Sequence, residues 1–476
     1  MKNKYIMKGK VKVAFIHLAG FESKHALFRV PPLTFQCLAA VTPLDVEIVL
    51  IDESFEAIDF DIEVDIVGIS VILPFSQKAY FVAECFKNKG VTVVLGGHHV
   101  TAMPDEAIKF ADTIVIGEGD LVWPDLIYDY KRGALKSVYK SKELADLAFL
   151  PQPRKDLISL KTKYYSISNS VLATRGCPHA CTYCSIKYTF PGFRKRPVKD
   201  VIEDIENSIG NFLQKKIFIF WDDNIVGDKE YAYELFGEMV HLHKYWISQA
   251  TLADFASDKK MVQLASKSGC KGIFCGIESI NQSSLQNVNK NINDVRKYKK
   301  YIEILHDNGI SVDAGMMIGF DDDDKRIFEQ TLETAIKLNI DIMNLVLVTP
   351  YPGTPLFKKL EKEQRLLHKD WSLYDAHHVV FKPKNMSPNE LLEGWHWTRK
   401  EFYKLGLIGK RVLNSGAPSW ITLPHNLSTR RYVKMESKNK LDYSTVQQEI
   451  RVLKNGKYEK KKEEFIKIKK STFENI

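Results

Sequence analysis

Residues 170–184 read SVLATRGCPHACTYC, a short β-branched run that ends in three closely spaced cysteines. The cysteines follow the pattern C-x3-C-x2-C, at Cys177, Cys181 and Cys184. Thiolates on one loop can bind three iron corners of an iron–sulfur cluster and leave the fourth iron open to a substrate. The stretch therefore predicts a cluster at the end of a β-strand.

Zinc is the competing interpretation of these cysteines. A structural zinc site needs four ligands, often from paired C-x2-C elements, and this sequence has no second pair. Cys270 and Cys275 belong to a later part of the same domain, and His179 inside the motif is expected to be an exposed loop residue. Three unrelated thiols are a further alternative, which the position directly after a strand disfavours.

The region around the motif alternates strands with helical stretches. Strands are expected near residues 170–176, 216–224, 246–252, 272–279, 312–320 and 341–351. Six βα units in a row predict a partial barrel, (β/α)6, over residues 166–365, with functional residues at strand ends.

A second α/β pattern precedes the barrel. Five β-branched runs, at residues 11–18, 46–52, 65–73, 91–97 and 112–117, are separated by amphipathic stretches. They predict a doubly wound, Rossmann-like domain over residues 1–130, with ligands at the strand C-termini. Residues 131–165 have weak periodicity and suit a linker. Residues 366–476 predict a helical extension with a basic tail.

Composition agrees with a folded, soluble protein of 476 residues, 45% hydrophobic and 27% charged. The longest apolar stretch, residues 66–75, is about half the length of a membrane-spanning helix. No transmembrane helix is expected, and the N-terminus lacks a cleavage site, so the cytoplasm is the predicted location. The net charge of +9 comes largely from lysines at residues 454–470. A solvated helix is favoured there over a surface for nucleic acid or anionic lipid.

The segment CPHACTYC, with an aromatic Tyr183 before the last cysteine, resembles the cluster motif of the radical S-adenosylmethionine (SAM) superfamily. The resemblance implies a 4Fe–4S cluster on the three cysteines. Its open iron would bind SAM, and an electron would cleave SAM to a 5'-deoxyadenosyl radical. An electron donor such as flavodoxin or ferredoxin is then an expected partner.

Further segments resemble the SAM-binding elements of that superfamily. In FWDDN, the resemblance assigns Asp222, Asp223 and Asn224 to the SAM amino group. In GIFCGIES, it implies that Glu278 binds the ribose hydroxyls. It also implies that Gly276, which has no side chain, allows the ligand to approach closely. Gln249 is expected to face the methionyl carboxylate. The alternative for these carboxylates is a role as strand-end or helix-capping groups.

A doubly wound domain before the barrel resembles the cobalamin-binding class of the superfamily, which includes hopanoid methylases and the anaerobic magnesium-protoporphyrin cyclase. This resemblance rests on three segments of the first domain: VGISVIL, VVLGGHHVTAMPDEA and ADTIVIGEGD. It implies room for the nucleotide tail of cobalamin beside Ser70, Gly96 and Gly97.

The cobalt-binding motif D-x-H-x-x-G does not occur in the first domain. The histidines near its strand ends are His17, His98 and His99. His98 is expected to be a loop residue rather than a cobalt ligand, so the resemblance predicts cobalamin without a histidine ligand, or a domain that has lost the cofactor.

The sequence thus predicts a cobalamin-dependent methyltransferase for an unactivated carbon, or phosphorus, of a lipid, tetrapyrrole or natural product. A radical SAM cyclase, oxidoreductase or coupling enzyme without methyl transfer is the alternative. A methylthiotransferase is weaker, because it needs three N-terminal cysteines and only Cys37 and Cys85 occur there, both in expected helices. The hypothesis of a non-catalytic iron–sulfur or RNA-binding protein would not explain the segments that resemble SAM-binding elements. No nucleic-acid partner is expected, whereas peripheral contact with a membrane is an alternative that the sequence does not decide.

Overall fold

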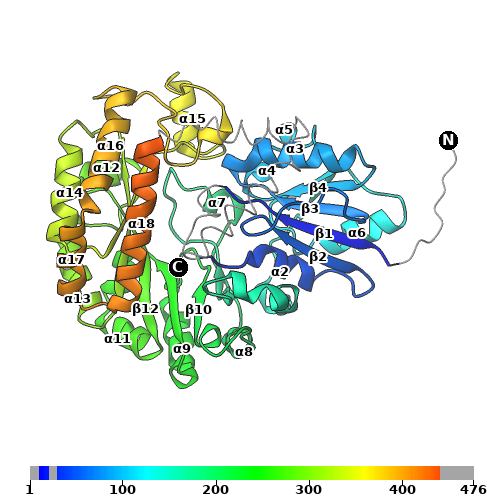
Figure 1. Cartoon of the computed structure of the whole chain (residues 1–476), viewed down its shortest axis with the longest axis horizontal. Helices are drawn as coiled ribbons and strands as arrows, with labels where there is room; N and C mark the ends of the chain where they lie inside the picture. Colours follow the sequence, from blue (N-terminus) through cyan, green and yellow to red (C-terminus); the bar gives the residue numbers. More distant parts are fainter. Residues whose placement is uncertain (1–9, 21–28, 440–476) are drawn as a thin grey trace, which may run out of the picture.

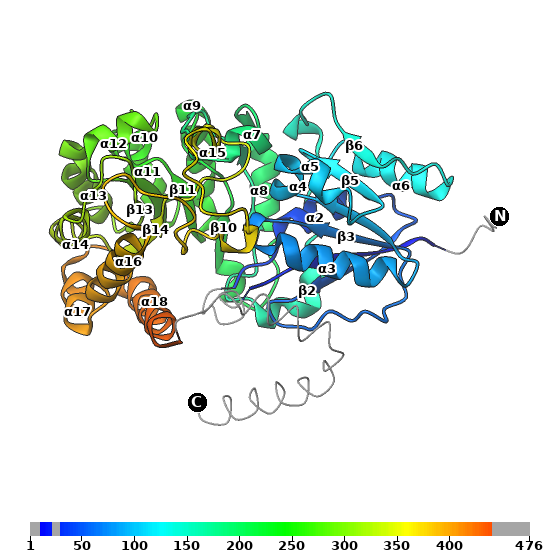
Figure 2. The ribbon, with the colours of Figure 1, turned by 90° about the horizontal axis from the view of Figure 1, so that it is seen from above.

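A computed structural model of the protein describes residues 10–20 and 29–439. Two parallel β-sheets, each covered by helices, lie next to each other along the long axis (Figure 1). Seen from above, α15 (Pro355–Lys362) lies over the boundary between them (Figure 2). The basic tail predicted at residues 454–470 lies outside the described residues.

The first sheet has the strand order β2-β1-β3-β4-β5-β6, all parallel. This order confirms the predicted doubly wound domain. Its strands are β1 (Lys12–His17), β2 (Glu47–Asp52), β3 (Ile66–Ser70), β4 (Thr92–Gly96), β5 (Thr113–Ile116) and β6 (Val138–Lys140). Its helices are α2 (Leu33–Ala40), α3 (Ser76–Lys87), α4 (His98–Ala102), α5 (Pro104–Ala107) and α6 (Trp123–Lys131).

Alternating side chains of β1 show how both faces of this sheet are covered. Val13 and Phe15 pack with residues of α2 and α6, whereas Ala14 and Ile16 pack with α3, α4 and α5. Successive side chains of a strand point to opposite faces, so a strand buried on both faces appears as a continuous apolar run.

The sixth strand corrects the prediction of a five-stranded sheet. β6 extends the edge beside β5 and comes from the segment that was predicted to be a linker. Three residues, with only Tyr139 buried, are too few to produce a detectable strand pattern.

The second sheet confirms the predicted six-stranded partial barrel, with the parallel order β14-β13-β12-β11-β10-β7. Its strands are β7 (Ser170–Val171), β10 (Ile217–Phe220), β11 (Tyr245–Ala250), β12 (Cys270–Glu278), β13 (Ser311–Ile318) and β14 (Ile342–Leu347). The helices of this region, besides α15, are α7 (Ile186–Thr189), α8 (Val198–Glu206), α9 (Lys229–Met239), α10 (Leu252–Ala256), α11 (Lys259–Lys267), α12 (Gln282–Asn287), α13 (Tyr298–His306) and α14 (Ile327–Lys337).

The first predicted barrel strand, residues 170–176, is divided in two. β7 pairs with β10, but β8 (Thr174–Arg175) turns away and pairs antiparallel with β9 (Arg194–Lys195). The backbone N–H groups of Ala173 and Thr174 donate to the Asp222 carboxylate rather than to a neighbouring strand. This side-chain acceptor ends the ladder three residues before the cysteines.

Apart from one short 3-10 helix at Trp371–Leu373, the described part of the C-terminal extension is helical only from Pro388 onward, in α16 (Pro388–Phe402), α17 (Leu405–Asn414) and α18 (Ser419–Asn439). A capping box between Ser387 and Glu390 starts α16. Residues 366–381 instead form an irregular segment, in which Trp371 and Tyr374 pack with Leu73 of the first domain.

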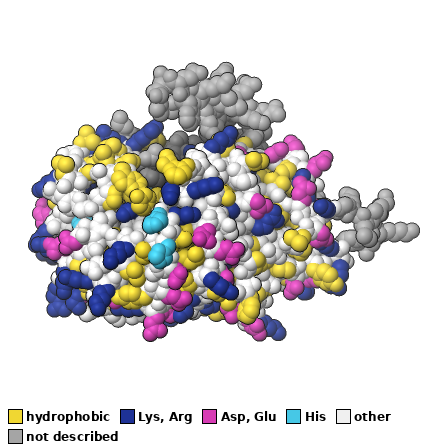
Figure 3. All heavy atoms as spheres, turned by 90° about the horizontal axis from the view of Figure 1, so that it is seen from below, with side chains coloured by type: hydrophobic (Ala, Val, Ile, Leu, Met, Phe, Trp, Pro, Cys, Tyr) yellow, Lys and Arg dark blue, Asp and Glu magenta, His cyan; other side chains and the backbone are white. Residues whose placement is uncertain are grey.

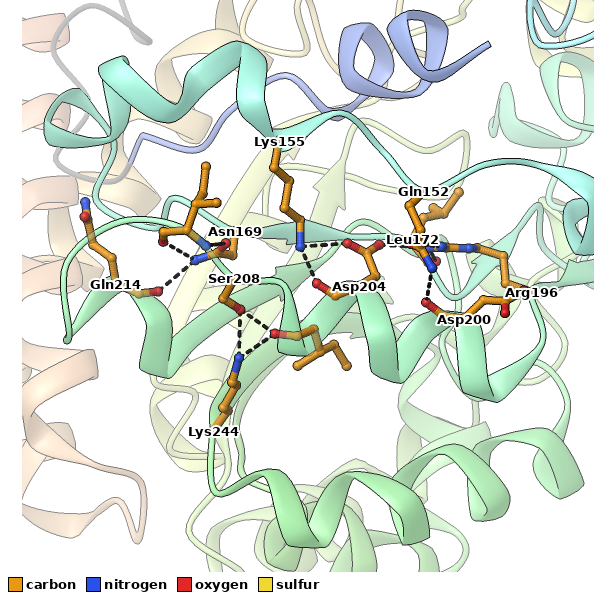
Figure 4. Close-up of polar contacts among 12 residues, drawn as sticks. Gln152, Lys155, Asn169, Leu172, Arg196, Asp200, Asp204, Ser208, Gln214 and Lys244 are labelled. Carbon is orange, nitrogen blue, oxygen red and sulfur yellow. Dashed lines mark hydrogen bonds and ion pairs between the residues drawn. The ribbon is translucent and has the colours of Figure 1, made fainter.

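A buried ion cluster fastens the connecting segment to the barrel (Figure 4). The Lys155 ammonium and the Arg196 guanidinium lie 2.7 and 2.9 Å from the two oxygens of the Asp204 carboxylate. Arg196 also donates to Gln152, which in turn donates to the carbonyl of Asp200. Because all three ions are nearly fully buried, each depends on the others for compensation of its charge.

No helix within residues 10–20 and 29–439 is both long and apolar enough to cross a membrane.

The fold predicts different effects for two Trp→Ala substitutions in the extension. Trp371 is buried, and its indole N–H donates to Glu106 of α5 at 2.9 Å. Trp371→Ala should lower the free energy of unfolding by about 3–5 kcal/mol, because it leaves a cavity between the extension and the first domain. Trp397 on α16 is 43% exposed, so Trp397→Ala should change the free energy of unfolding little. Equal shifts of the thermal midpoint in the two variants would contradict this packing.

Candidate functional site

The cysteine loop begins with a glycine that no other residue can replace without strain. Gly176 has φ +88°, and a Cβ there would lie 2.0 Å from the carbonyl oxygen of Gly192. Beyond it, the backbone of Thr182 donates to Val288, and the Asn289 side chain donates to Ala180. The segment after α12 therefore holds the loop from its other side.

The three thiols lie on this loop and are buried or half-buried. Burial raises the pKa of Cys177 and that of Cys184, the latter to about 12, while the ammonium of Lys290 lowers the pKa of Cys177. Bound metal would reverse these shifts, because a coordinating thiol is deprotonated.

Three thiols on one loop are the kind of ligand set that holds an iron–sulfur cluster. Among the residues that the structure describes, no group of three or more His, Cys, Asp or Glu is spaced to hold one metal ion. In a 4Fe–4S cluster each thiolate binds a different iron, so the sulfur atoms need not converge on one point. One loop with three partly buried thiols meets that requirement.

Glu278 ends β12 beside the cysteine loop. Its backbone has φ +66°, a strained conformation for a residue with a side chain. Its carboxylate lies 3.4 Å from the ammonium of Lys290. Burial and then this carboxylate raise the pKa of Tyr183, so Glu278 lies close to the residue that precedes the third cysteine. A Cβ on Gly276 would lie 2.0 Å from the Glu278 carboxylate, so Gly276 makes room for this side chain.

The three polar residues after β10 differ in their surroundings. Asp222 is fully buried and accepts from the backbone of Ala173 and from the backbone and hydroxyl of Thr174. Burial raises its pKa to about 7 despite these bonds. Asp223 is half-buried and accepts from the backbone N–H of Gly176 at 3.1 Å. Asp223 thus contacts the start of the cysteine loop directly and, unlike Asp222, is only half-buried.

Asn224 belongs to a second network, which sequence reasoning missed. Its amide donates to Asp254 of α10 at 3.0 Å, and the His179 ring lies 2.7 Å from the same carboxylate oxygen. Burial raises the pKa of Asp254, but the bonds from His179 and Asn224 outweigh this effect and lower it. His179 is thus a half-buried partner of Asp254 rather than an exposed loop residue. Gln249 lies half-buried on β11.

The residue before Gly176 joins the cysteine loop to the first domain. The Arg175 guanidinium lies 2.7 Å from Asp120 and 3.0 Å from Glu118, and all three side chains are buried. Arg194 of β9 also donates to Glu118. Glu118 and Asp120 follow β5 in the segment GEGD. We call this set of four residues the Arg175 clamp.

The edge of the first sheet nearest the clamp consists of small residues. Gly97 has φ +98°, and a Cβ there would lie 2.8 Å from the backbone nitrogen of Val71 and 2.9 Å from Ser70 Oγ. A Cβ on Gly96 would meet only Val115, at ordinary contact distance, and one on Gly117 would meet nothing. Gly97 is thus required by the close approach of two strands, whereas Gly96 and Gly117 leave free space at the strand ends.

Of the histidines at this edge, His99 is buried, whereas His17 and His98 are half-buried. Burial lowers the pKa of His17 and that of His98. His98 begins α4 rather than lying in a loop, and its Nδ1 lies 3.0 Å from the hydroxyl of Thr189 in α7. His99 Nε2 lies 2.7 Å from the Tyr80 hydroxyl. His98 and His99 thus serve contacts within the protein.

Fold and site together define a class of protein: a parallel partial barrel with three cysteines after its first strand and carboxylates after its second and fourth strands, joined to a doubly wound domain. The profile of the radical SAM superfamily matches residues 171–335. The bacteriochlorophyllide d C-12(1)-methyltransferase of Chlorobaculum tepidum is 32% identical over 371 residues, 77% of this chain and 80% of that protein. The chain belongs to the radical SAM superfamily, and its cofactors include a 4Fe–4S cluster and SAM.

Two further similarities agree with this assignment. The bacteriochlorophyllide d C-8(2)-methyltransferase of the same organism is 29% identical and aligns with 74% of this chain and 80% of its own length. Among solved structures, the radical SAM methyltransferase TsrM from Kitasatospora setae has a TM-score of 0.69 at 13% identity, covering 90% of this chain and 100% of TsrM. The likeness to TsrM shows that the two-domain fold is shared.

Loss of the Arg175 clamp should impair cluster assembly. Arg175→Met removes the cation that pairs with buried Asp120 and leaves Glu118 with Arg194 alone. Breaking a buried ion pair in this way typically costs about 3–5 kcal/mol of unfolding free energy. Because Cys177, the first of the three cysteines, is two residues away, iron content after anaerobic reconstitution should fall as well. Arg132→Met, at a largely exposed guanidinium, is the matched control. Full iron content and unchanged thermal stability in Arg175→Met would contradict the clamp.

Proposed function

We propose that the protein is a cobalamin-dependent radical SAM methyltransferase that methylates an unactivated carbon of a tetrapyrrole. The main structural support for this proposal is the Arg175 clamp, because it joins the cysteine loop directly to the strand-end edge of the doubly wound domain. The similarity to a bacteriochlorophyllide methyltransferase supports the reaction and the substrate class. A lipid or another natural product is the alternative substrate.

For SAM, we assign the accessible polar groups around the cysteine loop. Asp223 receives the SAM ammonium, Glu278 the ribose hydroxyls, and Gln249 faces the methionyl carboxylate. Asp222 and Asn224 hold the surrounding backbone and helix in place, since their own hydrogen bonds are satisfied within the protein. When bound, the cluster supplies the electron that cleaves SAM through its open iron.

Lys290 is an addition to this set. Burial lowers its pKa, but Glu278 and the thiols of Cys181 and Cys177 raise it by a larger amount. Lys290 therefore stays charged, and it offsets the negative charge of the thiolates and of Glu278. This charge balance makes the site more favourable for SAM, which brings its own carboxylate.

For cobalamin, we assign the free space at the ends of β3, β4 and β5. Ser70, Gly96 and Gly97 lie at this edge, and Gly117 faces open space. A structure of TsrM contains cobalamin and a 4Fe–4S cluster in the shared fold. When bound, cobalamin supplies a cobalt atom that carries the methyl group. His98 is engaged with Thr189, and His99 with Tyr80, so we expect cobalamin without a histidine ligand.

The partners that we propose follow from this chemistry. A flavodoxin or ferredoxin delivers the electron, and the reducing cytoplasm keeps the thiols available for the cluster. No nucleic acid is required. A methylthiotransferase is disfavoured because Cys37 lies on α2 and Cys85 on α3, and these helices cover opposite faces of the first sheet.

The ribose assignment predicts a defined loss of SAM affinity. Glu278→Ala should weaken SAM binding by about 1.5–3 kcal/mol for each charge-assisted hydrogen bond that is removed. Isothermal titration of the anaerobically reconstituted protein measures this value. Glu303→Ala, at an exposed site on α13, is the matched control. Unchanged affinity in Glu278→Ala at normal iron content would show that Glu278 does not bind SAM.

The cobalamin assignment is tested at Gly96. Gly96→Ala fits the available space, because its Cβ would make only ordinary contacts, so cobalamin binding should persist. Gly96→Leu should fill the space and strain a bound cofactor by roughly 1–3 kcal/mol or more. The visible absorbance that remains after gel filtration measures retention. A wild type that never retains cobalamin would favour a cyclase, oxidoreductase or coupling enzyme. Equal retention in Gly96→Leu would place the cofactor elsewhere.

A further inference from the structure

The helix α18 has an unusual distribution of side chains. Its solvent-facing stripe carries Trp420, Leu423 and Leu427, which are 55%, 40% and 44% exposed, followed by Arg431 and Lys434. These five positions are spaced by three or four residues and so lie on one face of the helix. We call this stripe the α18 outer face. A surface helix normally turns its apolar side chains inward, but this face presents them to solvent.

The buried side of α18 explains this arrangement. Asn426 is fully buried, accepts from Arg411 and donates to the carbonyl of Asp341. Thr422 and Glu436 are buried on the same side, and Glu436 pairs with Arg399. Specific polar contacts thus attach α18 to the barrel. The two leucines of the outer face take no part in these contacts.

A groove adjoins the outer face. It has a volume of about 380 Å³ and is lined by apolar residues and basic residues only: Leu405, Leu427, Arg430, Arg431, Lys434 and Met435. An apolar floor with a basic rim combines hydrophobic burial with attraction to anions. The same combination of apolar and Lys or Arg side chains lets helices lie in the headgroup region of anionic membranes.

Aromatic and basic residues extend this surface to the underside of the barrel. The Trp420 ring lies 5.9 Å from the ring of Tyr245, over which Lys271 lies at 5.2 Å. Tyr245 pairs in the sheet with the first residue of β10, and the segment just before β10 exposes Phe212 and Leu213. Figure 3 shows the underside, where hydrophobic side chains lie next to Lys and Arg side chains. Tryptophan and tyrosine are the residues that favour a membrane–water interface.

We propose that the α18 outer face and its groove dock the enzyme onto an anionic membrane surface. Charge decides between the occupants. The chain's own residues 440–476 contain ten Lys or Arg and six Asp or Glu, a net charge of +4, and a second copy would present the same basic groove. A net positive charge disfavours both as occupants beside Arg431, whereas anionic headgroups are attracted to it. The proposal is independent of the methyltransferase assignment, because it does not involve the cysteine loop.

Vesicle sedimentation of the full-length, cluster-loaded protein tests the proposal. Wild type should sediment with vesicles of phosphatidylcholine mixed with phosphatidylglycerol and bind much less to phosphatidylcholine alone. Leu423→Ser combined with Leu427→Ser should weaken binding by roughly tenfold or more, because two apolar side chains are no longer transferred from water into the membrane. Arg431→Glu should weaken binding to the anionic vesicles by roughly tenfold and leave binding to neutral vesicles unchanged.

The matched control is Leu44→Ser, at a leucine that is fully exposed on the first domain. It should bind vesicles like wild type, and iron content verifies that every variant is folded. Full vesicle binding by the double leucine variant would overturn the proposal and indicate that residues outside α18 bind the lipid. A wild type that elutes as a dimer, with the double leucine variant eluting as a monomer, would overturn it in favour of a second copy.

Discussion

The pairing of Arg175 with Glu118 and Asp120 is the interaction on which the rest of the site depends. A buried guanidinium is stable only where carboxylates compensate its charge, and here both carboxylates come from the other domain. Burial of Arg175 at this position therefore requires the two carboxylates of the first domain. The cysteine loop begins directly after Arg175, so its position is fixed relative to both sheets.

Rigid polar contacts then extend from this point through the loop. Asp222 holds the backbone before the cysteines, and Asp254 holds His179 within the motif. These carboxylates are occupied by the protein. Asp223 and Glu278 are only half-buried, and Lys290 lies 3.4 Å from the Glu278 carboxylate. We therefore propose that Asp223 and Glu278 bind the charged ligand, whereas Asp222 and Asp254 support the loop.

The sequence was sufficient for the architecture and for the cysteine motif. Continuous apolar runs mark strands buried on both faces, and the compact spacing of Cys177, Cys181 and Cys184 predicts the cluster loop. The roles of individual polar residues needed the structure. The Arg175 clamp joins residues more than fifty positions apart, and no local pattern reveals such a pairing.

Local patterns also failed where a structural element is short or where two roles use the same residue type. β6 has three residues and only one buried side chain. Asp222 and Asp223 are adjacent and chemically identical, yet one is fully buried beneath the strand ends and the other faces the loop. Gly97 looks like a residue that makes space for a ligand, but the backbone of Val71 already fills the position of its Cβ.

The central claim is that this cysteine loop holds a cluster that cleaves SAM. The most direct measurement is 5'-deoxyadenosine formed by the anaerobically reconstituted protein with dithionite and SAM, quantified by mass spectrometry. Wild type should form it, and a variant with alanine at Cys177, Cys181 and Cys184 should not. Equal formation by both proteins, or a triple variant that keeps four iron atoms, would contradict the account.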